Sequence, residues 1–217
     1  MSADSLDPAF AGSVDAAESA DRADRPRPVG RGEKVRAAVL AAVLRELVET
    51  GYAALTVDQV AQRAGVHKTT VYRRWKDRDT LVVDALTDHI AADIPIPDTG
   101  SVAEDLELLA RGLVGWLGSP VGRAVVTTML SDAVRVPEIA DARRRIFHDR
   151  TLRAAPVVAR AIERGELPPG TDATELIKDL VAPIYFRVLI TGEPVDTGTA
   201  DRAAAAVLAA AAARRDA

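Results

Sequence analysis

Basic, hydroxyl and aromatic side chains are concentrated in one stretch of the sequence, GVHKTTVYRRWKDRD at residues 65–79. Five of these fifteen residues are lysine or arginine, two are adjacent threonines, and a tyrosine and a tryptophan lie among them. Lysine and arginine bind phosphates, and arginine can also bind a guanine edge through two hydrogen bonds. Threonine and tyrosine hydroxyls add short contacts to phosphates. The composition of this stretch therefore indicates a surface that binds DNA.

The distribution of charge along the chain points the same way. The 217-residue chain has a formal net charge of −4. Residues 31–80 carry 10 Lys and Arg against 6 Asp and Glu, a net charge of +4, whereas residues 81–217 carry 15 against 20, a net charge of −5. A basic segment in an acidic protein is typical of a phosphate-binding module. A solvated helix face would give the same counts, so charge alone leaves both interpretations open.

Two short helices joined by a tight turn are predicted to carry the basic stretch. Thr56 begins the first helix with a capping box, and Gly65 ends it. The second helix covers about residues 68–74, with Val71 and Trp75 facing inwards. About three residues, including a glycine, separate the two helices, and this spacing predicts a helix-turn-helix. Its second helix would lie in the major groove of DNA.

Helical patterns extend over the rest of the chain, which is predicted to be all-α with about nine helices. A helix runs from Glu33, where apolar residues recur every four positions, to a stop at Gly51. Later helices are predicted from their first residues. These starts are Asp77, Ser101 in a capping box with Glu104, Ser119 with Pro120, Pro137, Asp172 and an alanine-rich segment at 199–215. Pro156 is expected to break or kink the helix that contains it.

The first 31 residues show no sustained apolar periodicity and are predicted to be a disordered tail. The tail ends in a run of arginines (Arg22, Arg25, Arg27 and Arg31). Such an arm could enter a minor groove, and the alternative is a solubilising leader.

Nine side chains are candidates for DNA contact. Those on the second helix of the motif would meet phosphates or base edges, with Arg73 and Arg74 suited to guanine. Thr56 lies at a helix N-terminus, where backbone N–H groups attract a phosphate. The candidates are Thr56, His67, Lys68, Thr69, Thr70, Tyr72, Arg73, Arg74 and Arg78. For Arg78 the alternative is a salt bridge to Asp77 or Asp79.

The run GYAALTVDQVAQRAGVHKTTVYRRWKDRDTLVVDAL, within Glu33 to Leu86, resembles the DNA-binding domain of the tetracycline-repressor (TetR/AcrR) family. The Gly-Tyr pair, the threonine cap, the A-x-x-A-G-V turn, the T-V-Y core and the K-D-R-D entry match in order. The segment from PDTGSVAEDLELL to FRVLITGEPVD more loosely resembles the C-terminal domain of one branch of that family. One residue departs from the pattern: His67 stands where the family usually has a capping serine. It serves either as a structural substitute or as a contact to DNA.

The resemblance implies a homodimer that binds a palindromic DNA operator and a small-molecule effector. It implies a three-helix DNA-binding domain at 32–78 and a helical domain for effector binding and dimerisation at 79–217. In the family the last two helices form the dimer interface, here about 172–192 and 199–215. Leu180, Ile184, Val188 and Leu189 would supply apolar area, and the alternative is an internal core helix.

Large side chains in the later part of the chain are candidates for the effector pocket, because such pockets are mostly apolar with a few polar groups. They are Trp116, Met129, Phe147, His148, Tyr185 and Phe186. His148 and Arg187 could each supply a polar group. Ordinary core packing or a surface contact is the alternative for each candidate.

Enzyme chemistry finds little support in the sequence. The chain has no cysteine and only three histidines, none paired at metal-binding spacing, and it lacks a Gly-rich phosphate loop and a G-x-S-x-G motif. We therefore expect no enzyme activity, no cofactor and no metal. The absence of a signal peptide and of an apolar run of about 20 residues predicts a cytoplasmic location without membrane contact.

Three functions remain compatible with the sequence. The first is a ligand-responsive transcriptional repressor. The second is an activator or a broad DNA-binding regulator, which differs from a repressor only in where it binds. The third is a helical ligand-binding protein without DNA binding, against which the basic and hydroxyl residues of 65–79 argue.

Overall fold

A computed structural model describes residues 30–92, 95–132 and 135–214. The described residues form ten α-helices and two π-helical turns, with no strand, which confirms the predicted all-α class. The chain divides into two compact units, Met1–Lys34 and Val35–Ala217. Of the first unit only residues 30–34 are described, so the predicted tail and its arginine arm, apart from Arg31, lie outside the described residues. No helix in the described ranges is both long enough and apolar enough to cross a bilayer.

The first helix, α2 (Arg31–Glu49), begins two residues before the predicted start. The carbonyl of Gly30 accepts the backbone N–H groups of Glu33 and Lys34 at 2.9 and 3.1 Å. Gly51 follows α2 with φ of 74°, as its predicted role as a stop requires. A single helical turn that the sequence pattern did not reveal, α3 (Gly51–Ala54), comes next. It raises the count from the nine expected helices to ten.

The predicted helix-turn-helix is present as α4 (Val57–Ala64) and α5 (Lys68–Tyr72), which pack against each other. Helix α6 (Arg78–Ala92) follows. The carboxylate of Asp77 accepts the backbone N–H of Thr80 at 2.8 Å, which confirms the predicted cap of α6.

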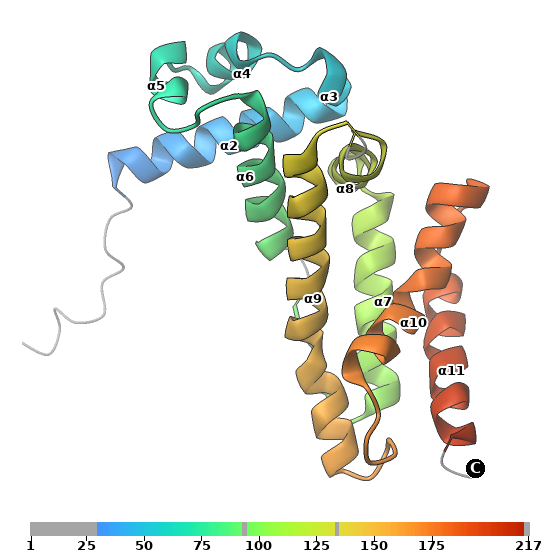
Figure 1. Ribbon diagram of the computed structural model, residues 1–217. Coiled ribbons are helices and arrows are strands. Elements are labelled where there is room, and N and C mark those ends of the chain that lie inside the picture. The colour runs from blue at the N-terminus through green and yellow to red at the C-terminus, as the bar shows by residue number, and fades with distance from the viewer. Residues whose placement is uncertain (1–29, 93–94, 133–134, 215–217) are drawn as a thin grey trace, which may run out of the picture. The chain divides into compact units, whose positions relative to one another are not determined.

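Seven further elements follow in the described part of the chain. They are α7 (Val102–Gly118), α8 (Pro120–Thr127), the π-turn η1 (Thr128–Asp132), α9 (Pro137–Glu163), α10 (Ala173–Phe186), the π-turn η2 (Arg187–Thr191) and α11 (Thr197–Ala213). Helix α7 packs on α11, and α10 packs on both α9 and α11 (Figure 1). Helix α9 also packs on α6, the helix that directly follows the helix-turn-helix.

The predicted capping box of α7 is wrong. Ser101 occupies the N-cap position, but its side chain makes no capping hydrogen bond. The first free N–H of the helix, that of Val102, instead donates to a carboxylate oxygen of Glu166 at 3.0 Å. A charged acceptor from a distant part of the chain makes a stronger bond than a serine hydroxyl, and sequence spacing cannot reveal it.

Pro156 does not break its helix, since α9 runs without interruption from Pro137 to Glu163. A proline within a helix removes the hydrogen bond to the carbonyl four residues earlier, which here belongs to Leu152. Both Leu152 and Pro156 are exposed, so water can hydrate that carbonyl. The remaining helix is held by buried Val157 and Val158 on its inner face.

The apolar interior consists of two clusters. The first core joins the buried residues of α2–α6 with Val125, Met129, Ile139, Ala142 and Ile146 from α8, η1 and α9. The second core joins α7, the end of α9, α10 and α11. Trp116 packs against both cores. The domain boundary predicted after Arg78 falls at the first residue of α6, whose buried side chains lie in the first core.

Candidate nucleic-acid interface

Helix α5 is anchored on one side and open on the other. Val71 and Trp75 are 1% and 4% exposed, as predicted. The indole Nε1 of Trp75 donates to Oδ2 of Asp84 in α6 at 3.0 Å, which ties the end of the motif to the next helix. Among the predicted contact residues, Thr70 and Arg78 are half-buried, and those exposed to solvent are Thr56, His67, Lys68, Thr69, Tyr72, Arg73 and Arg74.

The turn before α5 depends on a left-handed residue. Gly65 has φ of 68° and donates its N–H to the carbonyls of Ala61 and Gln62, while Val66 donates to Ala61 at 3.0 Å. These bonds satisfy the last carbonyls of α4 and reverse the chain within two residues. A side chain other than glycine is strained at this φ, so the turn depends on residue 65.

The start of α4 carries the predicted capping box. The Thr56 hydroxyl oxygen accepts the backbone N–H of Gln59 at 3.3 Å, and the Gln59 side chain accepts the backbone N–H of Thr56 at 3.0 Å. The hydroxyl also donates to the same Gln59 oxygen at 2.6 Å. Thr56 is exposed, so this helix start faces solvent with its hydroxyl held in place.

His67 occupies the N-cap position of α5 without capping it, because its side chain makes no hydrogen bond to the helix start. Only its backbone carbonyl takes part, by accepting the N–H of Thr70 at 2.8 Å. The imidazole is exposed. His67 therefore does not fill the first of its two predicted roles, that of a cap in place of serine.

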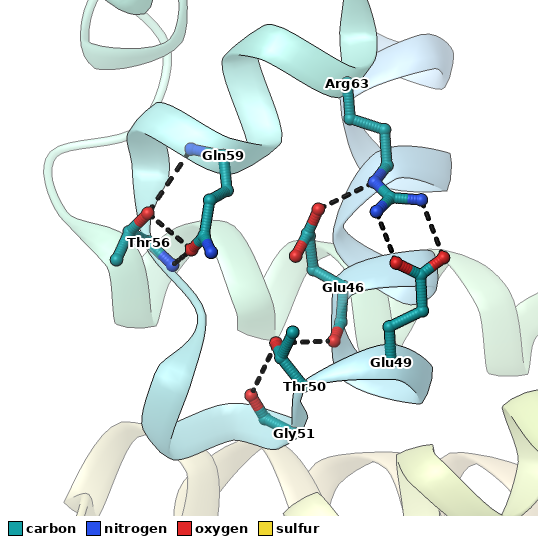
Figure 2. A network of polar contacts seen from close by, with 7 residues as sticks. All are labelled: Glu46, Glu49, Thr50, Gly51, Thr56, Gln59 and Arg63. Atoms are coloured by element: carbon teal, nitrogen blue, oxygen red, sulfur yellow. Dashed lines mark hydrogen bonds and ion pairs between the residues drawn. The ribbon is translucent and has the colours of Figure 1, made fainter.

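An ion-pair network that the sequence did not reveal holds α4 on α2 (Figure 2). Nε of Arg63 donates to Oε1 of Glu46 at 2.6 Å, and its terminal nitrogens bind both carboxylate oxygens of Glu49. Glu46 is only 4% exposed. Arg63 holds the pKa of Glu49 below its ordinary value through these hydrogen bonds. Three charged residues on two separate helices carry no local signal, so only the fold brings them together.

Arg78 forms the salt bridge that the alternative interpretation predicted. Its Nε lies 3.1 Å from Oδ1 of Asp79, and its guanidinium lies 4.4 Å from the centre of the Tyr52 ring. The Tyr52 hydroxyl donates to the same carboxylate at 2.7 Å. Burial, together with that hydrogen bond, raises the pKa of Tyr52 to about 12. The side chain of Arg78 remains 35% exposed at the start of α6.

Helix α5 ends at Tyr72, two residues before the predicted end, so Arg73 and Arg74 follow the helix. Lys68 at its start and Arg74 after its end each make a contact within the chain. Nζ of Lys68 lies 3.5 Å from a carboxylate oxygen of Asp58, and both side chains are more than half exposed. The guanidinium of Arg74 lies 5.7 Å from the centre of the Trp75 ring. An exposed salt bridge such as that of Lys68 and Asp58 contributes about 0–1 kcal/mol, so a phosphate can replace it at low cost.

Four of the six predicted effector-pocket residues converge. Trp116, Met129, Phe147 and Tyr185 line one small cavity, and the rings of Phe147 and Tyr185 meet edge to face with centres 5.7 Å apart. Burial raises the pKa of Tyr185 to about 12.

Two of the six are not part of this cavity: His148 is exposed, and Phe186 is 56% exposed. Arg187, the other polar candidate, pairs with Glu193. The sequence missed Arg150, which also lines the cavity. In the described ranges no group of three His, Cys, Asp or Glu is placed to hold a metal ion.

Comparisons with known proteins agree with this architecture. Residues 39–85 match the family of bacterial regulatory proteins called the tetR family, and residues 96–207 match the tetracyclin repressor-like C-terminal domain. The transcriptional regulator AqdR of Rhodococcus erythropolis is 33% identical over 180 residues, which cover 82% of this chain and 86% of AqdR. A DNA-binding transcriptional repressor of Mycobacteroides abscessus is 34% identical over 175 residues, covering 77% of this chain and 88% of that protein.

The crystal structure of the TetR-family regulator SCO0332 has a TM-score of 0.67 and 33% identity, and covers 82% of this chain and 98% of its own. All three relatives are named as regulators of transcription, and none as an enzyme. The chain therefore belongs to the tetracycline-repressor family of DNA-binding transcriptional regulators, as its helix-turn-helix and helical C-terminal region indicate.

Proposed function

We propose that the chain is a ligand-responsive transcriptional repressor, which binds a palindromic operator as a homodimer and leaves it when a small molecule binds. The observation that carries the proposal is the two-sided character of residues 68–75: Val71 and Trp75 are buried on one side, and the other side presents hydroxyls and cations to solvent. The relative in Mycobacteroides abscessus is named a repressor, which supports repression rather than activation for this chain. Chromosomal DNA as the target implies a cytoplasmic location.

On DNA, α5 enters the major groove and the start of α4 lies on the backbone. Arg73 or Arg74 makes the base contacts, while Lys68, Thr69 and Thr70 bind phosphates or a thymine methyl. Tyr72, with half of its surface exposed, and Thr56, with its hydroxyl held by Gln59, position the backbone. The exposed imidazole of His67 adds a donor at the groove.

Two copies are required to read two half-sites, and the surface of α10, η2 and α11 is suited to joining them. Phe186 and Ile190 are 56% and 71% exposed, which is high for large apolar side chains. The alanines of α11 permit close helix packing. Of the apolar residues expected at the interface, Leu180 and Ile184 are fully buried within the subunit, so the internal-core alternative holds for those two.

The effector binds in the helical region, and α6 carries its effect to DNA. Helix α6 begins directly after the helix-turn-helix and packs along α9, whose side chains line the cavities. A shift of α6 in each subunit changes the separation of the two α5 helices and so weakens binding to a fixed half-site spacing.

The test is binding to the DNA that flanks the protein's own gene, compared with random duplex of equal length and at stated salt. Arg73→Ala or Arg74→Ala should weaken binding to the cognate site by about 1–3 kcal/mol and relax the preference at one position per half-site. Arg144→Ala is the matched control, because it removes an arginine from the exposed face of α9. Equal loss on cognate and random DNA in both variants would show that neither arginine reads bases. Expression of a reporter gene that falls when the protein binds the operator would confirm repression. Expression that rises would identify an activator.

A further inference from the structure

The boundary between the two cores, which we call the seam, contains two small cavities that share four residues. Leu113, Phe147, Arg150 and Tyr185 line both cavities, which have volumes of about 80 and 10 Å³. Leu113 belongs to the second core, whereas Phe147 packs against the first. Apart from Arg150, Thr151 and the Trp116 and Tyr185 polar atoms, the lining side chains are apolar. The seam is thus an apolar interior with one cation in its wall.

A larger cavity of about 320 Å³, which we call the mouth, adjoins the seam between α6 and α9. Among the described residues, Arg145, Arg150 and Arg153 line it together with one acid, Asp149, which forms a salt bridge with Arg153 at 2.8 Å. Its apolar lining includes Ile90 and Ile146, which the smaller seam cavity also contains. Arg150 is common to the mouth and to both seam cavities. The charges of the mouth favour anions, and its apolar floor continues into the seam.

Arg150 also connects α9 to α6. Its Nη1 donates to the backbone carbonyl of Ile90 at 3.0 Å. Ile90 lies in the last turn of α6, where carbonyls have no partner within the helix. The guanidinium therefore holds the end of the helix whose other end follows the DNA-binding motif.

Building on the proposed repressor function, we propose that the effector is a hydrophobic weak acid, whose carboxylate binds Arg150 while its apolar body enters the seam. Acyl or aromatic acids have this chemistry. A carboxylate forms a charge-assisted, two-pronged bond with a guanidinium, which is stronger than the bond of a neutral carbonyl. The acid therefore competes with Ile90 for Arg150 and releases the end of α6.

The small volume of the seam cavities strengthens the coupling between ligand binding and movement of α6. Cavities of about 80 and 10 Å³ are well below the roughly 300–1,000 Å³ of ligand pockets, so an apolar body can enter only by moving the two cores apart. Met129 and Ile90 belong to the core that contains α2–α6, and both line the seam. The Tyr185 hydroxyl is protonated at neutral pH even at the ordinary tyrosine pKa of 10.0, and burial raises that pKa further, so the hydroxyl is a donor rather than a repelling charge.

The ligand test uses the full-length protein with decanoate and 2-naphthoate as probe acids and 1-decanol and 2-naphthalenemethanol as neutral counterparts. Calorimetry gives affinities, and Trp116 in the seam wall gives an independent fluorescence signal. We expect at least one acid to bind about 10-fold or more tightly than its alcohol. Arg150→Gln removes the charge, and its shorter side chain no longer reaches the Ile90 carbonyl as the guanidinium does. It should remove the preference for the acid, and Arg150→Lys should retain part of it.

Arg144→Gln on the same helix is the matched control, because its side chain lies outside the three cavities and is 67% exposed. It should leave both affinities unchanged. Acid affinity that is equal in wild type and Arg150→Gln overturns the proposal. So does equal affinity for acid and alcohol, or no binding of either acid up to about 1 mM.

The coupling test first forms a complex of the protein with a duplex that it selects from a random library. The probe acid that bound in calorimetry is then added to this complex. Acid should lower the affinity of wild type for the duplex, whereas the duplex affinity of Arg150→Gln, whatever its value without acid, should not change when acid is added. Acid binding through Arg150 without release overturns the coupling. Failure of the protein to select any duplex contradicts the repressor function instead, and the ligand measurements distinguish the two failures.

Discussion

Arg63 of α4 is bonded to Glu46 of α2 through a contact of 2.6 Å in which the carboxylate is almost completely buried. The same guanidinium binds Glu49, one turn further along α2 (Figure 2). The pair therefore fixes how α4 lies on α2. Because only Gly65, Val66 and His67 join α4 to α5, it also fixes the direction of the DNA-binding helix.

Glu46→Gln should lower the free energy of unfolding by about 1–2 kcal/mol, because a neutral acceptor replaces a charged one at a buried position. Chemical denaturation with an unchanged m-value measures the effect. Glu49→Gln is the control, since its carboxylate is 52% exposed and its replacement should have a smaller effect. Equal losses in the two variants would contradict the special role of the buried carboxylate.

Asp77 should make α6 sensitive to acid. The backbone hydrogen bond from Thr80 holds the pKa of Asp77 below its ordinary value of 3.8. A lowered pKa means that the folded state favours the charged carboxylate. Its contribution is therefore complete above pH 3.8 and is lost as the pH falls through the folded-state pKa.

Asp77→Asn keeps a capping oxygen that does not titrate, so it should flatten the pH dependence of stability in that acid range. Asp77→Ala should cost about 1 kcal/mol at neutral pH by removing the cap. Thermal unfolding between neutral and acid pH measures both. An identical acid profile in wild type and Asp77→Asn would show that other carboxylates account for the transition.

Arg78 is held by Tyr52 and Asp79, and we propose that it also binds a backbone phosphate of DNA, a role that can be tested against the structural one. If it neutralises one phosphate per subunit, Arg78→Ala should make the slope of log affinity against log salt shallower by about 1.8 per dimer. The loss should be similar on specific and random DNA. A lower unfolding temperature with an unchanged slope would assign Arg78 to packing alone.

Ile190→Asp should dissociate the proposed dimer. It replaces the most exposed large apolar side chain of η2 with a charged one, which would be buried in the interface. Sedimentation over a range of concentrations measures the change, and operator affinity should fall with it. Leu152→Asp is the matched control, since Leu152 is 53% exposed on α9, away from the proposed interface. A dimer that survives Ile190→Asp but not Leu152→Asp would move the interface to α9.

Local signals predicted much of the fold. The capping box at Thr56, the left-handed Gly65 and the carboxylate of Asp77 act within a few residues, and all three have the predicted roles. The inward positions of α5 were also predictable, because a helix of that length must bury one face. These features needed only neighbouring residues.

Features that depend on distant parts of the chain were not predictable. The cap of α7 comes from Glu166, and the partner of Ile90 is Arg150 on another helix. Pro156 was expected to break or kink its helix, but α9 is not broken, because packing of its neighbours outweighs one lost hydrogen bond. Among the pocket candidates, size alone could not separate buried Met129 from exposed Phe186.

The first core has a consequence for exchanging parts between regulators. Its members reach from α2 to α9, so the DNA-binding helices share an interior with Met129 and Ile139. A chimera that takes residues up to 78 from this protein would divide that interior. The transferred DNA-binding segment would lose its buried partners Leu81, Val82 and Leu86. To change the DNA specificity of this protein, exposed side chains of α5 should therefore be replaced one by one, and the surrounding helices should be left unchanged.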